Sequence, residues 1–331
     1  MVRFLHPGLL TVHDTAPIVE GSSVREALAR AVDLAKLAER FGFGRYWTAE
    51  THGMRAVAGC SPEVVCAAAA GATTRVRIGA AGVLLPHHPP LLVSERFGTL
   101  EALYPDRIDL CLGRSLGGPR AAADAIRAER DDSVSGVAAQ IDALTSRFRQ
   151  EYHLGVRSVT GYGYEPQLWI PGTGTISAAL AAQRGLPYAF GGHLNVGATD
   201  AAVTEYHEQA ERASARKHLA VSVGVIAADT RREAEHLAES HRMKVMQRVV
   251  YKRRVFLPDP DIAARDRPTD PRLLEEYYRA TKGFLIGDGD DVGRGLAELR
   301  ERTGADELIV STPVFDHDAR SRSYRLVAGH G

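Results

Sequence analysis

The chain has 331 residues, and its 41 basic side chains are balanced by 41 acidic ones, so the formal net charge is zero. This balance provides no bulk electrostatic attraction to nucleic acid or to an anionic membrane. Hydrophobic residues make up 44% of the chain and charged residues 25%, which are the proportions of a soluble globular protein.

The sequence gives no sign of secretion, membrane insertion or metal binding. The first segment, MVRFLHPGLLTVHD, lacks the basic start and long apolar stretch of a signal peptide. The longest apolar run, residues 64–72, is far too short for a membrane span. The three cysteines, Cys60, Cys66 and Cys111, follow no zinc-type spacing and cannot all pair. We therefore predict a cytoplasmic protein without a metal centre that binds neither nucleic acid nor membrane.

Helix-like and strand-like segments alternate along the chain. Ser23 and Glu26 form a capping box at the start of the first predicted helix. Apolar residues at helical spacing follow as far as Ala38, and Gly42 is placed to end the helix. The apolar segment RYWTA, which begins at Arg45, is predicted to be a strand.

The same alternation continues to the end of the chain. Helices are predicted near 61–71, over 91–103, over about 121–152, over 177–185 and near 201–215. Each is followed by a predicted strand, and the strands are VRIGAAGVLL, RIDLCLG, QLWIPG, PYAFG and LAVSVGVIA, with DELIVST after further helical sequence. With a strand near the N-terminus, this makes about eight βα units. The strands are continuous apolar runs, as in a parallel sheet covered on both faces. We predict one TIM barrel domain over residues 1–331, with an open doubly wound sheet as the alternative.

A long insertion at about 229–303 precedes the last predicted strand. It contains the aperiodic segment FLPDPDIAARDRPTDP, and segments of this kind are usually functional or mobile. Because the insertion leaves the barrel at the carboxyl end of a strand, our hypothesis is that it forms a lid over the site.

Polar residues follow the predicted strands, where a barrel gathers its active site. They are Glu50, Thr51 and His52 after the second strand, His87 and His88 after the third, Arg114 and Ser115 after the fourth, Thr173 to Ser177 after the fifth, and His193 and Asn195 after the sixth. A single strand-end histidine is most often a surface or hydrogen-bonded residue. The convergence of the whole set predicts an active site at this end of the barrel.

The segment IPGTGTISAALAAQRG indicates an anion site. A strand leads through Thr173, Gly174 and Thr175 into a helix for which Ser177 is the expected N-cap. Backbone N–H groups, hydroxyls and a helix dipole together favour a phosphate. An ordinary capped helix is the alternative, but Arg114 at the end of the adjacent strand favours the anion. The sequence contains no nucleotide-binding glycine motif after a strand.

These segments resemble the bacterial luciferase-like flavin-dependent monooxygenases. The resemblance rests on FGFGRYWTAETH, RVRIGAAGVLLPHHPP, ERFGTLEALYPDRIDLCLGRSLG, ISAALAAQRGLPYAFGGHL and GADELIVSTPVFDHDARSRSYRLVA. The subgroup that is most similar acts in natural-product biosynthesis. The resemblance implies a homodimeric TIM barrel that takes reduced FMN from a separate flavin reductase. In that scheme a flavin C4a-hydroperoxide oxygenates a small organic substrate.

The resemblance also implies roles for particular residues. Arg114 and the turn of Thr173, Gly174 and Thr175 would hold the flavin phosphate. The Ala81-Gly82 bond would be a cis peptide beneath the isoalloxazine, although small residues there also fit simple close packing of the barrel wall.

One departure concerns the motif after the second strand, which is Glu50-Thr51-His52 where the family has Glu-His-His. Threonine is no general base near neutral pH, so His52 or another residue such as His193 would handle protons. Two other functions stay open: hydride transfer with the deazaflavin F420, and flavin binding without catalysis.

Overall fold

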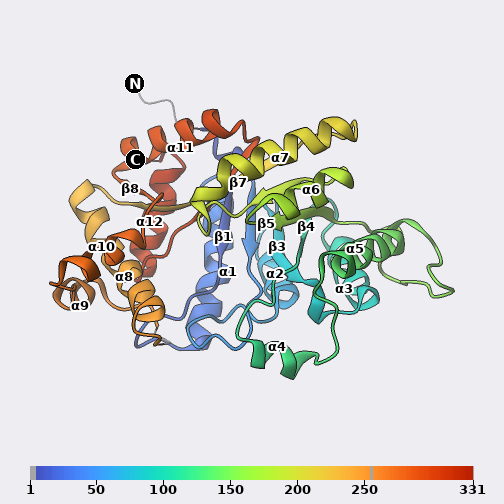
Figure 1. Ribbon diagram of the computed structural model, residues 1–331, viewed down its shortest axis with the longest axis horizontal. Coiled ribbons are helices and arrows are strands. Elements are labelled where there is room, and N and C mark those ends of the chain that lie inside the picture. The colour runs from blue at the N-terminus through green and yellow to red at the C-terminus, as the bar shows by residue number, and fades with distance from the viewer. Residues whose placement is uncertain (1–4, 254–255, 331) are drawn as a thin grey trace.

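The structure, a computed structural model, describes residues 5–253 and 256–330. Eight of the nine strands in these residues form a closed ring of parallel strands, and the ring confirms the predicted TIM barrel (Figure 1). The ring strands are β1 (Leu10–Asp14), β2 (Arg45–Thr48), β3 (Arg77–Leu84), β4 (Ile108–Gly113), β5 (Gln167–Gly172), β6 (Tyr188–Phe190), β7 (Leu219–Ala227) and β9 (Glu307–Ser311). β1 lies between β2 and β9, and β7 lies between β6 and β9.

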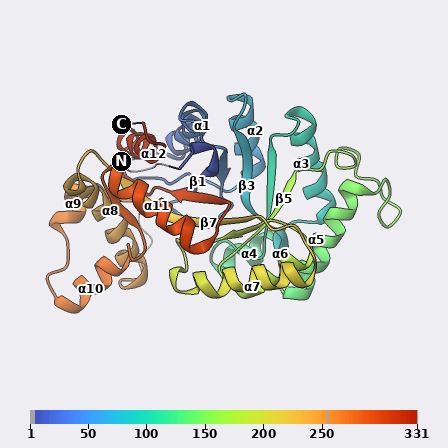
Figure 2. The ribbon, with the colours of Figure 1, turned by 90° about the horizontal axis from the view of Figure 1, so that it is seen from above.

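Most of the helices cover the outside of this ring, as Figure 2 shows from above, whereas α9 and α10 pack against α8. The helices are α1 (Val24–Arg40), α2 (Pro62–Gly71), α3 (Pro90–Leu103), α4 (Arg120–Ile126), α5 (Val134–Arg149), α6 (Thr175–Gln183), α7 (Thr199–Arg212), α8 (Arg231–Val249), α9 (Pro260–Arg265), α10 (Pro271–Arg279), α11 (Gly289–Thr303) and α12 (His317–Val327). The capping box predicted for α1 is present, because the Ser23 side chain accepts from the Glu26 N–H at 3.2 Å and the Ser23 N–H donates to Glu26 at 2.8 Å.

Two details of the sequence prediction are wrong. The helix predicted over about 121–152 is divided into α4 and α5, because the backbone is extended at Arg127 and Ser133 begins a new helix by accepting from the Gly136 N–H. The short strand β8 (Leu285–Gly287) was not predicted. It pairs with the last residues of β7 outside the ring, and three residues carry too little pattern to be recognised as a strand.

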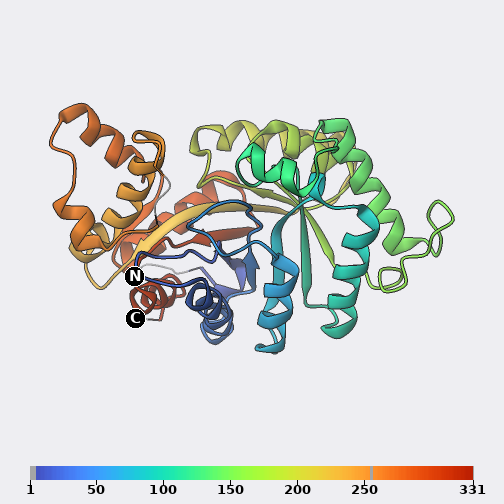
Figure 3. The same cartoon turned by 90° about the horizontal axis from the view of Figure 1, so that it is seen from below.

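The predicted insertion contains α8, α9, α10, β8 and α11, and its residues 254–255 lie outside the described residues. Helices α8 to α10 gather at one end of the molecule, beside the barrel, in all three ribbon views (Figure 3). They bury a small core of their own, made by Met243, Met246, Ala263 and Tyr277. The aperiodic segment folds in part as α9, whose first turn is capped by Asp259. A lid role for the insertion stays a prediction.

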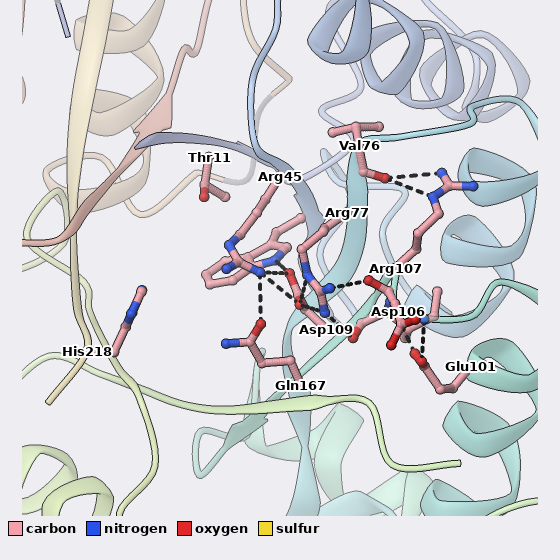
Figure 4. A network of polar contacts seen from close by, with 12 residues as sticks. Thr11, Arg45, Val76, Arg77, Glu101, Asp106, Arg107, Asp109, Gln167 and His218 are labelled. Atoms are coloured by element: carbon pink, nitrogen blue, oxygen red, sulfur yellow. Dashed lines mark hydrogen bonds and ion pairs between the residues drawn. The ribbon is translucent and has the colours of Figure 1, made fainter. Parts of the chain in front are cut away.

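A buried ionic network fills the amino-terminal end of the barrel (Figure 4). The Arg45 guanidinium donates to both oxygens of Asp109 at 2.8 and 3.0 Å and to both oxygens of Glu307 at 2.8 and 3.0 Å. Arg77 also pairs with Asp109. Trp47 and Trp169 form the next layer, with ring centroids 5.1 Å apart, and the Trp47 indole N–H donates to Asp109 at 2.8 Å. Access to the barrel interior is therefore from the carboxyl ends of the strands.

Candidate active site

A cavity of about 590 Å³ lies at the carboxyl ends of the barrel strands. Trp47, Ala189 and Ile309, which belong to the barrel interior, form its deepest part. The volume is in the range of a small-molecule or cofactor site. The cavity is therefore where the barrel rule predicts an active site.

The structure brings most of the predicted site residues to this cavity. Its lining includes Glu50, Thr51, Ala81, Gly82, Arg114, Thr173, Ser177 and His193. Gly174, Thr175 and His52 do not line it, although Gly174 follows Thr173, His52 follows Thr51 and is bonded to Glu50, and Thr175 lies two residues from both Thr173 and Ser177. None of the described residues of the insertion lines it.

One side of the cavity has the features of an anion site. Helix α6 begins at Thr175, and its N-cap Gly174 provides no side-chain hydrogen bond. The expectation that Ser177 is the N-cap is wrong, since Ser177 lies within the first turn. A Cβ on Gly172 would come within 2.2 Å of the Ser177 Cβ, so glycine at this position lets α6 begin close against β5. The first N–H groups of α6 therefore lack a capping side chain, which favours an anion.

Arg114 directly follows β4, and this exposed residue lines the same cavity. It makes no ion pair with any residue that the structure describes, whereas Arg120 and Arg130 further along the chain both pair with Asp124. A free guanidinium and an uncapped helix N-terminus on one cavity suit a phosphate group.

A second wall of the cavity is flat and made of small residues. The Ala81-Gly82 peptide bond is cis, as the resemblance implied. The register between β3 and β4 shifts at this point, between Ala81 and Val83. A Cβ on Gly82 would lie 2.9 Å from both the Cys111 carbonyl oxygen and the Pro171 Cγ, so the backbone is tightly held here. A wall without side chains lets a planar ring lie against the backbone.

Glu50 is the centre of a histidine cluster beside the cavity. Its Oε1 lies 2.7 Å from Nε2 of His52 and 2.7 Å from Nε2 of His88. Its other oxygen accepts the Leu84 N–H at 2.8 Å. Burial alone would raise the pKa of Glu50, but the hydrogen bonds from His88, His52 and Leu84 lower it, so the carboxyl group is ionised at neutral pH.

The contacts of this cluster show how His52 and Thr51 differ in their surroundings. The His52 imidazole is bound to Glu50, while the Thr51 side chain belongs to the cavity lining. His88 is a partner of Glu50 that the sequence analysis placed at a strand end without giving it a role. Its position shortly after β3 was the only feature of the sequence that pointed to a place in the site.

His193 lies on the opposite side of the cavity, with its Nδ1 2.6 Å from the Ser222 hydroxyl. Burial, followed by the nearby His13 and His241, lowers the pKa of His193 to about 3. His13 and Ser222 also line the cavity, and sequence reasoning missed both. Both residues lie inside apolar strands. Only the rule that alternate side chains of a strand point into the barrel, applied to β1 and β7, could have placed them at the cavity.

Two kinds of site have no support within the described ranges. No group of three or more histidine, cysteine, aspartate or glutamate side chains in residues 5–253 and 256–330 is arranged to hold a metal ion. In the same residues, no helix combines the length and apolar character that crossing a membrane requires.

Comparison with known proteins agrees with this geometry. The sequence profile of the luciferase-like monooxygenases matches residues 7–307. The chain belongs to this family. A protein of Escherichia coli (strain K12) called luciferase-like monooxygenase is 37% identical over 320 residues, covering 95% of this chain and 94% of the relative. The family makes the protein a flavin-dependent monooxygenase.

Solved structures share the fold. The crystal structure of apo-MsnO8 has a TM-score of 0.88 and 32% identity, and the match covers 97% of both chains. The oxygenating constituent of 3,6-diketocamphane monooxygenase from Pseudomonas putida, a Baeyer-Villiger enzyme solved with FMN, has a TM-score of 0.72. That match covers 99% of this chain and 98% of the other at 18% identity, so it shows a common fold only.

Proposed function

We propose that this protein is the oxygenase component of a two-component system, which uses reduced FMN and O₂ to oxygenate a small organic substrate. The observation that carries the proposal is the pairing, on one cavity, of an unpaired Arg114 and an uncapped helix N-terminus with the flat wall at Ala81 and Gly82. A phosphate at one end and a planar ring at the other are the two ends of FMN, which a ribityl chain joins.

The residues present fit FMN. Arg114, Thr173 and the first turn of α6 would hold the phosphate, and the Ala81-Gly82 backbone would support one face of the ring. When bound, reduced FMN would supply the electrons that activate O₂. The protein's part is to bind, to orient and to exclude water.

Apolar side chains provide the exclusion of water. Trp47 and Ile309 close the deep end of the cavity, and Leu84, Leu116 and Leu194 line its walls. Glu50, held by two imidazoles and a backbone N–H, stays ionised and fixes the segment that carries Thr51. His52 remains the proposed acid or base on that side, with Thr51 as the neighbouring cavity hydroxyl.

Two partners belong to the same proposal. A separate flavin reductase would supply reduced FMN, as in the scheme that the family resemblance implies. A homodimer is the expected assembly. Val64, Leu92 and Leu103 are exposed apolar residues on the neighbouring helices α2 and α3, and a second protomer would cover them in a dimer. Light scattering of the purified protein would measure the assembly directly.

Binding of FMN, riboflavin and F420 to the apo-protein tests the cofactor. We expect FMN to bind most tightly, because riboflavin lacks the phosphate and Arg114 is the one lysine or arginine among the described residues that line the cavity, which leaves little positive charge for the acidic tail of F420. Tighter binding of F420 than of FMN would favour hydride transfer and contradict the proposal.

A second experiment tests the reaction. The protein with FMN reductase, NAD(P)H and O₂ should consume O₂ with delayed release of H₂O₂ relative to free reduced FMN, because the apolar inner part of the cavity would shield the flavin ring from water. Tight FMN binding with H₂O₂ release as fast as in free solution would instead favour a non-catalytic flavin-binding protein. Recovery of activity in Thr51→His would strengthen that second reading.

A further inference from the structure

The hydrogen bonds of Ser222 determine which nitrogen of His193 carries the proton. The Ser222 hydroxyl oxygen accepts the His193 backbone N–H at 3.4 Å and lies 2.6 Å from Nδ1 of the same residue. The oxygen could also accept from Nδ1, but its own hydrogen would then have no acceptor among the described residues, so the arrangement in which the hydroxyl donates to Nδ1 is favoured. Nδ1 is then the acceptor, and Nε2 carries the proton.

The other nitrogen of His193 is available to a ligand. Nε2 has no hydrogen-bond partner among the described residues, and it is not one of the polar atoms sealed from solvent. His193 lines the cavity, so this N–H is the free donor of the ring. Burial keeps the imidazole uncharged at neutral pH, since it lowers the pKa of His193 to about 3.

The neighbouring imidazole of His13 lies on the same cavity and is neutral like that of His193. The His13 ring lies on the cavity with its centroid 5.5 Å from that of His193. His13 Nδ1 is sealed from solvent and has no partner in the part of the chain that the structure describes. A sealed N–H without an acceptor is costly, so the proton of His13 belongs on Nε2. Burial also lowers the pKa of His13, and both rings are neutral.

Apolar residues line much of the cavity beside this pair, while the buried Asp14 and Arg320 act on His13. Ala189, Phe190 and Leu194 line the cavity beside His193, and Trp47 and Ile309 lie at the deep end. A charged substrate group there would lose its hydration without gaining an ion pair. A neutral acceptor oxygen would gain a hydrogen bond in an environment that strengthens it.

We propose that His193 Nε2–H, oriented by Ser222, is a neutral hydrogen-bond donor that binds an acceptor oxygen of an uncharged organic substrate. The substrate class is a ketone, aldehyde, ester or amide with an apolar body, and carboxylates are rejected. His193 touches the substrate, whereas Ser222 is a positioning residue that fixes the tautomer. A neutral imidazole that polarises a carbonyl group is an established catalytic device in other enzymes. This inference rests on the proposed function, because it names the substrate of the same cavity.

The test uses protein loaded with oxidised FMN, so that no turnover occurs, and two probes of the same shape. Cyclohexanone carries an acceptor oxygen where methylenecyclohexane carries a CH₂ group. We expect calorimetry to show roughly 3- to 10-fold tighter binding of the ketone, as one hydrogen bond of this kind provides. Infrared difference spectra of ¹³C-labelled cyclohexanone should show the carbonyl stretch lowered on binding.

Variants separate hydrogen bonding from mere packing. His193→Phe keeps a ring and should lose both the ketone preference and the shift of the stretch, whereas His193→Gln keeps an N–H donor and should retain part of each. Ser222→Ala should reduce the shift, since Nδ1–H becomes an equal tautomer. The matched control is His236→Gln, an exposed histidine of α8 paired with Asp261, which should behave as wild type.

Two results would overturn the inference: equal binding of the two probes by wild type, or a ketone preference that survives in His193→Phe. FMN binding is measured in the same samples. Absence of the ketone preference in the wild-type protein with FMN binding intact overturns this inference alone, whereas failure of the wild-type protein to bind FMN overturns the proposed function and this inference with it.

Discussion

Replacing Arg114 by alanine should weaken the binding of FMN and leave the binding of riboflavin almost unchanged. Arg114 lines the cavity and makes no ion pair with any described residue, so its removal frees no buried partner charge and should not disturb the fold. The loss then reports the interaction with the phosphate, which riboflavin lacks.

The magnitude follows from the exposure of the side chain. A fully desolvated charge pair loses 5 kcal/mol or more when one partner is removed, and a pair at the rim of an interface loses little. Arg114 is exposed but faces a cavity that the ligand would close, and the α6 N–H groups would retain part of the phosphate binding. We therefore expect a loss of about 2–4 kcal/mol, which is roughly 30- to 1,000-fold in the dissociation constant.

The assay is the quenching of flavin fluorescence on titration of FMN and riboflavin into the apo-protein. Arg120→Ala provides the matched control, because Arg120 is an exposed arginine six residues along the chain that pairs only weakly, at 3.9 Å, with Asp124. Added salt should weaken FMN binding more in wild type than in Arg114→Ala. An unchanged FMN dissociation constant, or an equal loss for riboflavin, would refute the assignment of Arg114 to the phosphate.

Three further predictions concern catalysis and stability. His52→Ala should slow turnover by about 10²–10⁴-fold with FMN binding retained, as single-turnover kinetics would show, and an unaltered rate would move proton transfer elsewhere. Arg45→Met should lower the unfolding free energy by about 3–5 kcal/mol in urea titrations, because Asp109 and Glu307 stay buried with fewer partners, and a loss below 1 kcal/mol would contradict this. The ordinary pKa of His193 is 6.5 and burial lowers it to about 3, so the unfolded chain binds the proton first as pH falls. Stability should therefore decrease between pH 6.5 and 3 by up to about 1.4 kcal/mol per pH unit from this group, and His193→Gln should show a correspondingly smaller decrease.

The barrel and the place of the site were predictable because both depend on short-range patterns. Continuous apolar strands alternating with helices define the ring, and the rule for parallel strands then places Glu50, Arg114 and His193 at one end. The cis peptide at Ala81-Gly82 was expected from resemblance alone, since no local propensity of alanine and glycine requires it.

The remaining details depend on packing that a single sequence does not display. Ser177 has the right residue type for an N-cap, but α6 approaches β5 closely at Gly172, and its N-cap is Gly174, three residues earlier. His13 and Ser222 lie within strands. A shift of one residue in the strand register would turn such a side chain from the cavity toward the surrounding helices. His88 lies after β3 like many surface histidines, and only the folded chain brings it to Glu50.

The histidines bound to Glu50 and the histidine bound to Ser222 differ in which ring nitrogen remains free to contact a ligand. This difference helps to explain the threonine at position 51. Glu50 is a full negative charge that holds Nε2 of His52 and His88, so these rings stabilise a carboxylate and each leaves only Nδ1 for other contacts. Ser222 is uncharged and holds Nδ1 of His193, so that ring stays neutral and leaves Nε2–H on the cavity. A third imidazole at position 51 would lie beside the charge of Glu50 and compete for it. With threonine there, the charge stays shared between His52 and His88, and the free imidazole donor of the cavity comes from the opposite wall.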